Sequence, residues 1–245
     1  MAETAVLSGA TRTPPGLLSR FFGIVTAPKT TYESVVAHPR WLGMLIVTTL
    51  IVAAGMTLPM TTEAGREALL DKQVQQMEAF GMTVNDEMYQ QMRGRIWFAP
   101  YTTAGGIIVV SPVMLVILSG ILFAVFTAGM GGTASFKQVF AVVVHAGVIS
   151  ALGQVFTGAL NYVQGTMASG TNLAVLLPML AEGSFTGRLA GLIDVFLIWW
   201  VFVLAIGVAV LYRRRTQPIA VSLFGVYAVI AIAAAAVMGA FGGSK

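Results

Sequence analysis

The sequence predicts an all-α, polytopic integral membrane protein with five transmembrane helices. Of its 245 residues, 57% are apolar and only 10% are charged, and the mean hydropathy is +0.83. A globular domain carries charge on roughly a quarter of its residues. No charged side chain occurs between Arg95 and Lys137, between Lys137 and Glu182, or from Gln217 to Ser244. These gaps contain the continuous apolar stretches that a hydrocarbon core about 30 Å thick requires of a helix.

Five apolar stretches have the length of a spanning helix. The predicted spans are residues 41–58, 107–127, 139–160, 189–212 and 219–241. Helices are favoured over barrel strands because the stretches are continuously apolar, whereas barrel strands alternate over about ten residues. The spans and their connections form one predicted membrane domain, residues 41–245.

Residues 1–40 are predicted to form a cytoplasmic segment at the membrane interface. Apolar side chains recur at helical spacing around Arg20, namely Leu17, Leu18, Phe21, Phe22 and Val25. Such a helix is expected to lie among lipid headgroups. Pro28 is predicted to start a second short helix and Pro39 to end it. No small-residue cleavage site follows the apolar run, so we expect the first span to be retained as the insertion signal.

The basic residues predict the orientation. With the N-terminus in the cytoplasm, eight of the 14 basic residues lie inside: Arg12, Arg20, Lys29, Arg40, Lys137, Arg213, Arg214 and Arg215. The three adjacent arginines between the last two spans weigh most, because the positive-inside rule acts on short loops. Five spans then place the C-terminus outside, and the chain is expected in the cytoplasmic membrane of a bacterium.

Residues 61–100 are predicted to form an extracytoplasmic helical hairpin. Apolar side chains recur at helical spacing in two runs: Leu70, Val74 and Met77, then Met88, Met92 and Ile96. Gly81 and Thr83 separate the runs, and Thr83 with Asp86 has the spacing of a capping box. Either two amphipathic helices lie on the outer membrane surface, or the methionines form a groove for a partner helix or lipid.

The apolar stretch from Leu173 to Leu180 is too short to cross the bilayer. Asn172 is expected to cap it, and Pro178 to bend it. An interfacial helix is favoured over a re-entrant loop, because re-entrant backbone must be surrounded by protein or water.

Two glycine pairs have the spacing that lets helix backbones approach closely. These are Gly187 with Gly191 and Gly239 with Gly243. The spacing indicates helix packing or self-association.

Three polar residues within the predicted spans are the candidate intramembrane contacts: Asp194, Gln154 and His145. Asp194 and Gln154 lie at similar depth, and we expect them to form a hydrogen-bonded pair. The alternative is a functional role for Asp194 in an ion or proton relay. His145 is expected to make an interhelical contact rather than to bind a ligand. If Asp194 only holds helices together, Asp194→Leu should be tolerated.

The sequence points away from catalysis. It contains no cysteine and only two histidines, so thiolate chemistry is excluded and no metal-ligand spacing occurs. No nucleophile elbow, phosphate-binding loop, zinc-protease motif or dinucleotide fingerprint is present. We therefore predict no catalytic, cofactor-binding or metal-binding residue, no identifiable small-molecule substrate and no nucleic-acid partner.

The N-terminal segment carries a resemblance. The run Phe21-Phe22-Gly23-Ile24-Val25-Thr26-Ala27-Pro28-Lys29-Thr30-Thr31-Tyr32-Glu33, followed by His38-Pro39, resembles the bacterial branch of the Yip1 family. The run Ser135-Phe136-Lys137-Gln138-Val139-Phe140 is similar to that family too. The resemblance implies a five-span helical protein with a cytoplasmic N-terminus. Eukaryotic relatives act in vesicle trafficking and contact small GTPases, but their Asp-x-Tyr-Gly-Pro type motif is missing here, so no GTPase-binding residue is transferred.

The favoured function is that of a non-catalytic membrane protein that organises or adapts other membrane components. Its expected partners are membrane lipids and a membrane protein or a second copy of itself. The alternative is a transporter or transporter subunit that uses Asp194, Gln154 and His145 to line a polar path.

Overall fold

The computed structural model describes residues 15–79, 81–168, 170–177, 179–181 and 184–241, and within them every regular element is a helix. The prediction of an all-helical chain is confirmed. The elements are α1 (Leu17–Thr26), α2 (Pro28–Ala37), α3 (Leu42–Thr57), η1 (Pro59–Thr61), α4 (Glu63–Ala79), α5 (Asp86–Arg95), η2 (Ile96–Phe98), α6 (Ala99–Phe123), η3 (Ala124–Gly129), α7 (Phe136–Gln164), α8 (Leu173–Leu176), α9 (Phe185–Leu192), α10 (Val195–Leu211) and α11 (Thr216–Phe241).

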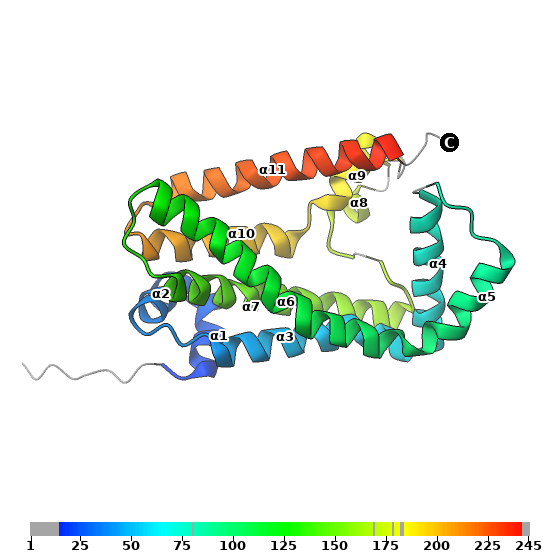
Figure 1. Cartoon of the computed structure of the whole chain (residues 1–245), viewed down its shortest axis with the longest axis horizontal. Coiled ribbons are helices and arrows are strands. Elements are labelled where there is room, and N and C mark those ends of the chain that lie inside the picture. Colours follow the sequence, from blue (N-terminus) through cyan, green and yellow to red (C-terminus); the bar gives the residue numbers. More distant parts are fainter. Residues whose placement is uncertain (1–14, 80, 169, 178, 182–183, 242–245) are drawn as a thin grey trace, which may run out of the picture.

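The helix α7 lies at the centre of a bundle formed with α3, α6, α10 and α11 (Figure 1). It packs against α3, α6 and α10, and its valines Val142, Val143 and Val144 are fully buried. Of the most apolar window of α7, 61% is buried, against 11% for the segment containing α6 and 17% for α11. The sequence of α7 therefore forms the protein core, whereas α6 and α11 turn most of their apolar surface outward.

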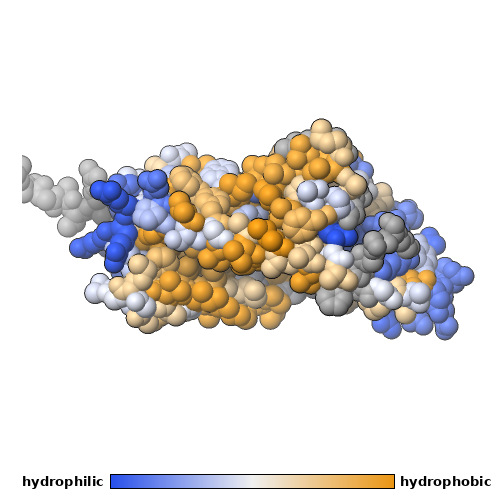
Figure 2. All heavy atoms as spheres, turned by 90° about the horizontal axis from the view of Figure 1, so that it is seen from above, coloured by the Kyte–Doolittle hydropathy of each residue, from blue (hydrophilic) through white to orange (hydrophobic). Residues whose placement is uncertain are grey.

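The outward surface is a broad apolar region with hydrophilic residues gathered toward both ends of the molecule (Figure 2). Within the part of the chain that the structure describes, three helical segments are long and apolar enough to cross a membrane, and they contain α6, α7 and α11. The helices α3 and α10 are apolar but shorter, with 16 and 17 residues. Side chains such as Val109 and Val229 are about two-thirds exposed on this surface. This arrangement is typical of a protein that lipid surrounds, and the predicted membrane location is supported.

The fourth apolar stretch differs from its prediction. Residues 189–212 were expected to form one helix, but α9 ends at Leu192 and α10 begins at Val195. Ile193 and Asp194 between them have extended backbone. The aspartate is the physical reason for this break, as described below.

The N-terminal helices α1 and α2 pack across one end of the bundle, against α7 and α10 (Figure 1). Pro28 occupies the first turn of α2, as predicted, and Pro39 comes two residues after the last residue of the helix, Ala37. Tyr32 of α2 is fully buried, and a Cβ atom on Gly207 of α10 would lie only 2.8 Å from its ring. This end, which also carries the α6–α7 and α10–α11 loops, is called the basic end below.

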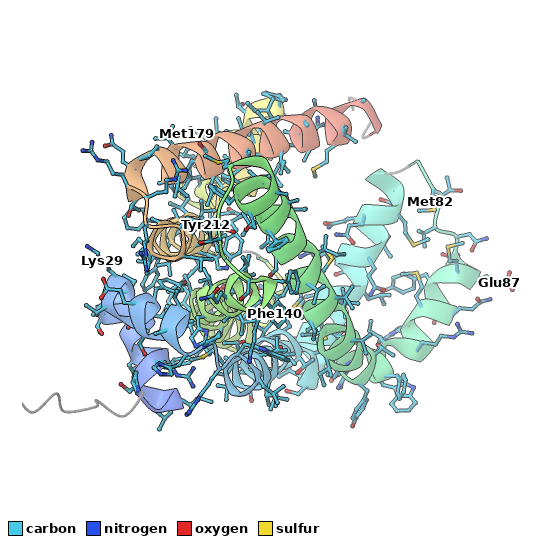
Figure 3. All side chains as sticks on the ribbon, turned by 60° about the vertical axis from the view of Figure 1, so that its left-hand side comes forward. Lys29, Met82, Glu87, Phe140, Met179 and Tyr212 are labelled. Atoms are coloured by element: carbon cyan, nitrogen blue, oxygen red, sulfur yellow. The ribbon has the colours of Figure 1, made fainter. Side chains whose placement is uncertain are left out.

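The opposite end carries α4 and α5, which project beyond the bundle and are called the hairpin end (Figure 1). The cap of α5 is Asn85, whose side chain accepts a hydrogen bond from the Met88 backbone at 2.9 Å. The expectation that Thr83 caps this helix was therefore wrong, because the helix begins two residues later. Met82 and Glu87 are both exposed on the hairpin (Figure 3).

The helices α3 and α7 pack with their backbones in close contact. A Cβ atom on Gly158 would lie 2.2 Å from the carbonyl oxygen of Gly55, and one on Gly55 would lie 2.6 Å from that of Gln154. Small residues allow such an approach, which is how helices associate where lipid removes the hydrophobic drive. Of the glycines singled out in the sequence, Gly239 does lie against Arg188 of α9, Gly187 lies against its own loop, Gly191 faces open space, and Gly243 lies outside the described residues.

We expect Gly158→Ala to lower the free energy of unfolding by about 1–3 kcal/mol, because the new methyl group forces α3 and α7 apart. Gly225→Ala on α11 is the control, since no atom lies within 4 Å of that site. Alanine there should be neutral or stabilise by up to about 1 kcal/mol. Thermal unfolding of both variants in detergent measures the difference. Equal effects of the two substitutions would show that the α3–α7 crossing is not constrained.

Candidate functional site

Asp194 caps the N-terminus of α10. Its carboxylate accepts hydrogen bonds from the backbone N–H groups of Phe196 and Leu197, at 2.8 and 3.1 Å, and from the hydroxyl of Thr171. The backbone beside Asp194 also pairs with the start of α8, because the N–H of Leu173 donates to the Ile193 carbonyl at 2.9 Å. An acid is favoured at this position because it satisfies free N–H groups and faces the positive end of the helix dipole. Asp194 therefore breaks the apolar stretch and holds the loop before α8 against α10.

Gln154 is half-buried on α7, at the turn whose carbonyl faces Gly55. Within the described residues it is not among the hydrogen-bond partners of Asp194. Asn172, by contrast, caps α8 as predicted, accepting from Val175 N–H at 3.1 Å.

His145 is fully buried on α7 and makes two polar contacts. Its Nδ1 lies 2.7 Å from the carbonyl oxygen of Ala141, and its Nε2 lies 3.4 Å from Nη1 of Arg20. A guanidinium group has donors only, so Nε2 must accept and Nδ1–H must donate. These partners require the neutral imidazole, since a protonated ring would place a second cation beside Arg20.

Arg20, the residue that contacts His145, was not identified as a site residue from the sequence. In the structure its side chain is buried, with 8% of its surface exposed. Its Nη1 also donates to the carbonyl oxygen of Arg40 at 2.7 Å, so one side chain joins α1, α7 and the segment before α3. Burial and the neighbouring charge of Arg40 lower the pKa of Arg20. The signal in the sequence was a lone cation inside an apolar helix. The apolar spacing around it predicts a helix in the headgroup region, and it gives no sign of a partner that lies 125 residues away.

A basic cleft opens at the basic end, between α2 and the α10–α11 turn, and has a volume of about 670 Å³. Its lining residues are Lys29, Glu33, Ala209, Val210, Arg213, Arg214, Arg215, Thr216 and Gln217. A second hollow of about 400 Å³ shares Val210, Arg213 and Arg214 with it and extends to the glycine-rich α6–α7 loop. Lys29 and Tyr212 mark the two sides of this region in Figure 3.

Tyr212 forms a fixed wall of the second hollow. Its ring stacks on Phe126 with a centroid separation of 5.4 Å, and its hydroxyl lies 2.8 Å from that of Thr127. Both partners belong to η3, a π-helical turn, a conformation that is frequent at functional sites. Gly132 packs so closely on the tyrosine ring that a Cβ atom would lie 2.6 Å from it.

Arg213 has a backbone φ of +52°, and no other described non-glycine residue has a positive φ. The N–H of Arg214 donates to the Ala209 carbonyl and that of Arg213 to the Val210 carbonyl, which is the Schellman termination of a helix. Glycine is the usual residue at this position, because a side chain there costs about 1–2 kcal/mol. An arginine at this position therefore strains the backbone.

These features define an all-helical membrane protein in which Asp194 and His145 are hydrogen-bonded within the fold and whose basic end is hollowed. The chain matches the Yip1 domain over residues 22–238, and it belongs to the Yip1 family. It is also similar to the membrane protein YknW of Bacillus subtilis, with 22% identity over 232 residues, covering 92% of each chain. No solved structure gives a significant match.

We expect His145→Leu to lower the free energy of unfolding by about 1–3 kcal/mol, because it leaves the buried guanidinium of Arg20 with one acceptor fewer. The double variant Arg20→Met with His145→Leu should recover most of this loss, since no unpaired charge then remains. A double-mutant cycle measured by thermal unfolding in detergent tests the coupling. Strictly additive losses would show that the two side chains do not interact.

Because Asp194 caps α10, we expect Asp194→Leu to destabilise the protein rather than to be tolerated. Losing the cap should lower the free energy of unfolding by about 0.5–2 kcal/mol. Asp194→Asn is the matched control, because an amide oxygen also caps helix N-termini. Melting temperatures of the two purified variants make the comparison, and a leucine variant as stable as the parent would contradict the capping role.

Proposed function

We propose that the chain is a five-span, non-catalytic membrane protein that organises other membrane components, with its N-terminus in the cytoplasm. The carrying observation is that the polar groups of Asp194 and His145 contact the fold itself. The carboxylate of Asp194 is bonded to Thr171 and the start of α10, and both ring nitrogens of His145 have partners. Such groups support architecture rather than a path for solutes.

Five spans are supported by helix length and position. At 1.5 Å per residue, α3 and α10 extend about 24 and 26 Å, close to the roughly 30 Å of a hydrocarbon core. Both lie alongside α7, which is long enough to cross, so the short helices share its depth. Further helical residues adjoin both short helices in the chain: the turn η1 follows α3, and the helix α9 precedes α10.

A cytoplasmic N-terminus is supported by charge. Lys29, Arg40, Lys137 and the three arginines from 213 to 215 all belong to the basic end. The acidic residues Glu63, Glu67, Asp71, Asp86 and Glu87 belong to α4 and α5 at the hairpin end. Basic residues in short loops favour the cytoplasm.

The contact surface for a partner is proposed to be the α4–α5 hairpin. It projects from the bundle and is mostly exposed, and its exposed large apolar side chains include the methionines Met82 and Met88, which are 47% and 38% exposed. Flexible methionines suit surfaces that adapt to another helix. Lys72 ties α4 to the bundle by donating to the Met167 carbonyl at 3.0 Å, which holds the hairpin in position.

Photo-crosslinking probes at Met82 and Glu87 should capture one discrete membrane protein or a second copy of this chain in native membranes. A probe at Val229 on the apolar surface of α11 is the control, and it should react with lipid instead. In vesicles containing the purified protein, Asp194→Asn should leave any ion or solute flux unchanged. Hairpin probes that capture no more protein than the Val229 probe would reject the organising role through this surface. A flux that Asp194→Asn abolishes would reject the organising role in favour of transport.

A further inference from the structure

We propose that the basic cleft is a binding site for the phosphate headgroup of an anionic phospholipid. The inference concerns the cleft between α2 and the α10–α11 turn together with the hollow that adjoins it, and it does not depend on the organising role proposed above.

The charge of the cleft fits an anion. Four cations line it, Lys29 and the three arginines from 213 to 215, against the single carboxylate of Glu33. Among the described residues, none of these cations forms an ion pair with a carboxylate. Arginine guanidinium groups bind phosphate oxygens with paired N–H donors, and basic pockets between helices at the cytoplasmic face recognise lipid headgroups.

The position of the cleft fits a lipid rather than a soluble anion. Its inner wall is the end of α10, Ala209 and Val210, and the arginines follow that apolar helix directly. The boundary between apolar and charged residues is the depth at which lipid phosphates lie. The adjoining hollow adds apolar surface from Phe126, Met130 and Leu211, where a glycerol backbone or the start of an acyl chain can pack.

The backbone of the turn carries the argument further. Arg213 adopts the left-handed conformation that glycine would adopt without strain. Orientation in the membrane does not require a charge at this residue, since Arg214 and Arg215 adjoin it. Strain at a non-glycine residue is typical of functional positions. The Schellman hydrogen bonds and the stacked Tyr212 hold the backbone of the turn, so the exposed side chains of the three arginines extend from fixed points beside the cleft.

The test uses the full-length protein purified in neutral detergent. Phosphatidylglycerol, phosphatidylcholine and inorganic phosphate are titrated separately, with lipid retention measured by native mass spectrometry and stability by thermal unfolding. Phosphatidylglycerol should be retained and should raise the melting temperature, whereas phosphatidylcholine should not. Inorganic phosphate that reproduces the whole effect would assign the site to a free anion and overturn the lipid proposal.

Two sets of variants locate the site. Arg214→Gln with Arg215→Gln should weaken phosphatidylglycerol binding about tenfold. Arg93→Gln with Arg95→Gln on the hairpin removes the same charge from the opposite end and should leave binding unchanged. Equal losses in the two pairs would mean that binding follows net charge only, and would overturn the proposal.

Arg213→Gly separates binding from folding. Without lipid its melting temperature should equal or exceed that of the parent, because glycine relieves the strained backbone, while its affinity for phosphatidylglycerol should fall. A glycine variant that binds as tightly as the parent would show that the Arg213 side chain takes no part in the site.

Discussion

The close packing of α3, α6 and α10 around α7 is the interaction on which the rest of the structure depends. Within a bilayer, apolar side chains gain no hydrophobic free energy by moving from lipid into the protein interior. Helices therefore associate through close packing and hydrogen bonds. The fold uses both. Gly55 and Gly158 let two backbones meet, and Arg20 joins α1 to His145 across the end of the bundle. Helices far from this centre, such as α11, keep their apolar surface for lipid.

The apolar pattern of the sequence was sufficient to predict the helical class and where most of the long helices lie. The stretch 139–160 falls within α7, and the stretch 219–241 falls within α11. A charge-free apolar run of this length has few stable conformations other than a helix. The break at Asp194 could not be recognised in the same way. A mean over an apolar window hides one acid, and only the folded loop supplies Thr171 as its partner.

The contacts that form the candidate sites were less predictable, because they join residues distant in sequence. Arg20 and His145 each looked isolated, and their pairing depends on how α1 crosses α7. The predicted partner of Asp194 was chosen by depth alone, which says nothing of the rotation of a helix about its axis. The arginines were recognised as an orientation signal, whereas the cleft that they line requires α2 beside them.

The two ends of the molecule are built on different physical principles. At the basic end, stacking, a π-helical turn and a helix-ending motif fix the backbone around a hollow that four cations line. At the hairpin end, two polar helices project with methionines exposed, and these flexible side chains can adapt to the surface of a partner. A rigid, charged hollow suits a small, invariant chemical group, and a pliable surface suits a protein. The two proposals, a lipid at the basic end and a partner at the hairpin end, therefore rest on different physical features of one bundle, which α7 connects.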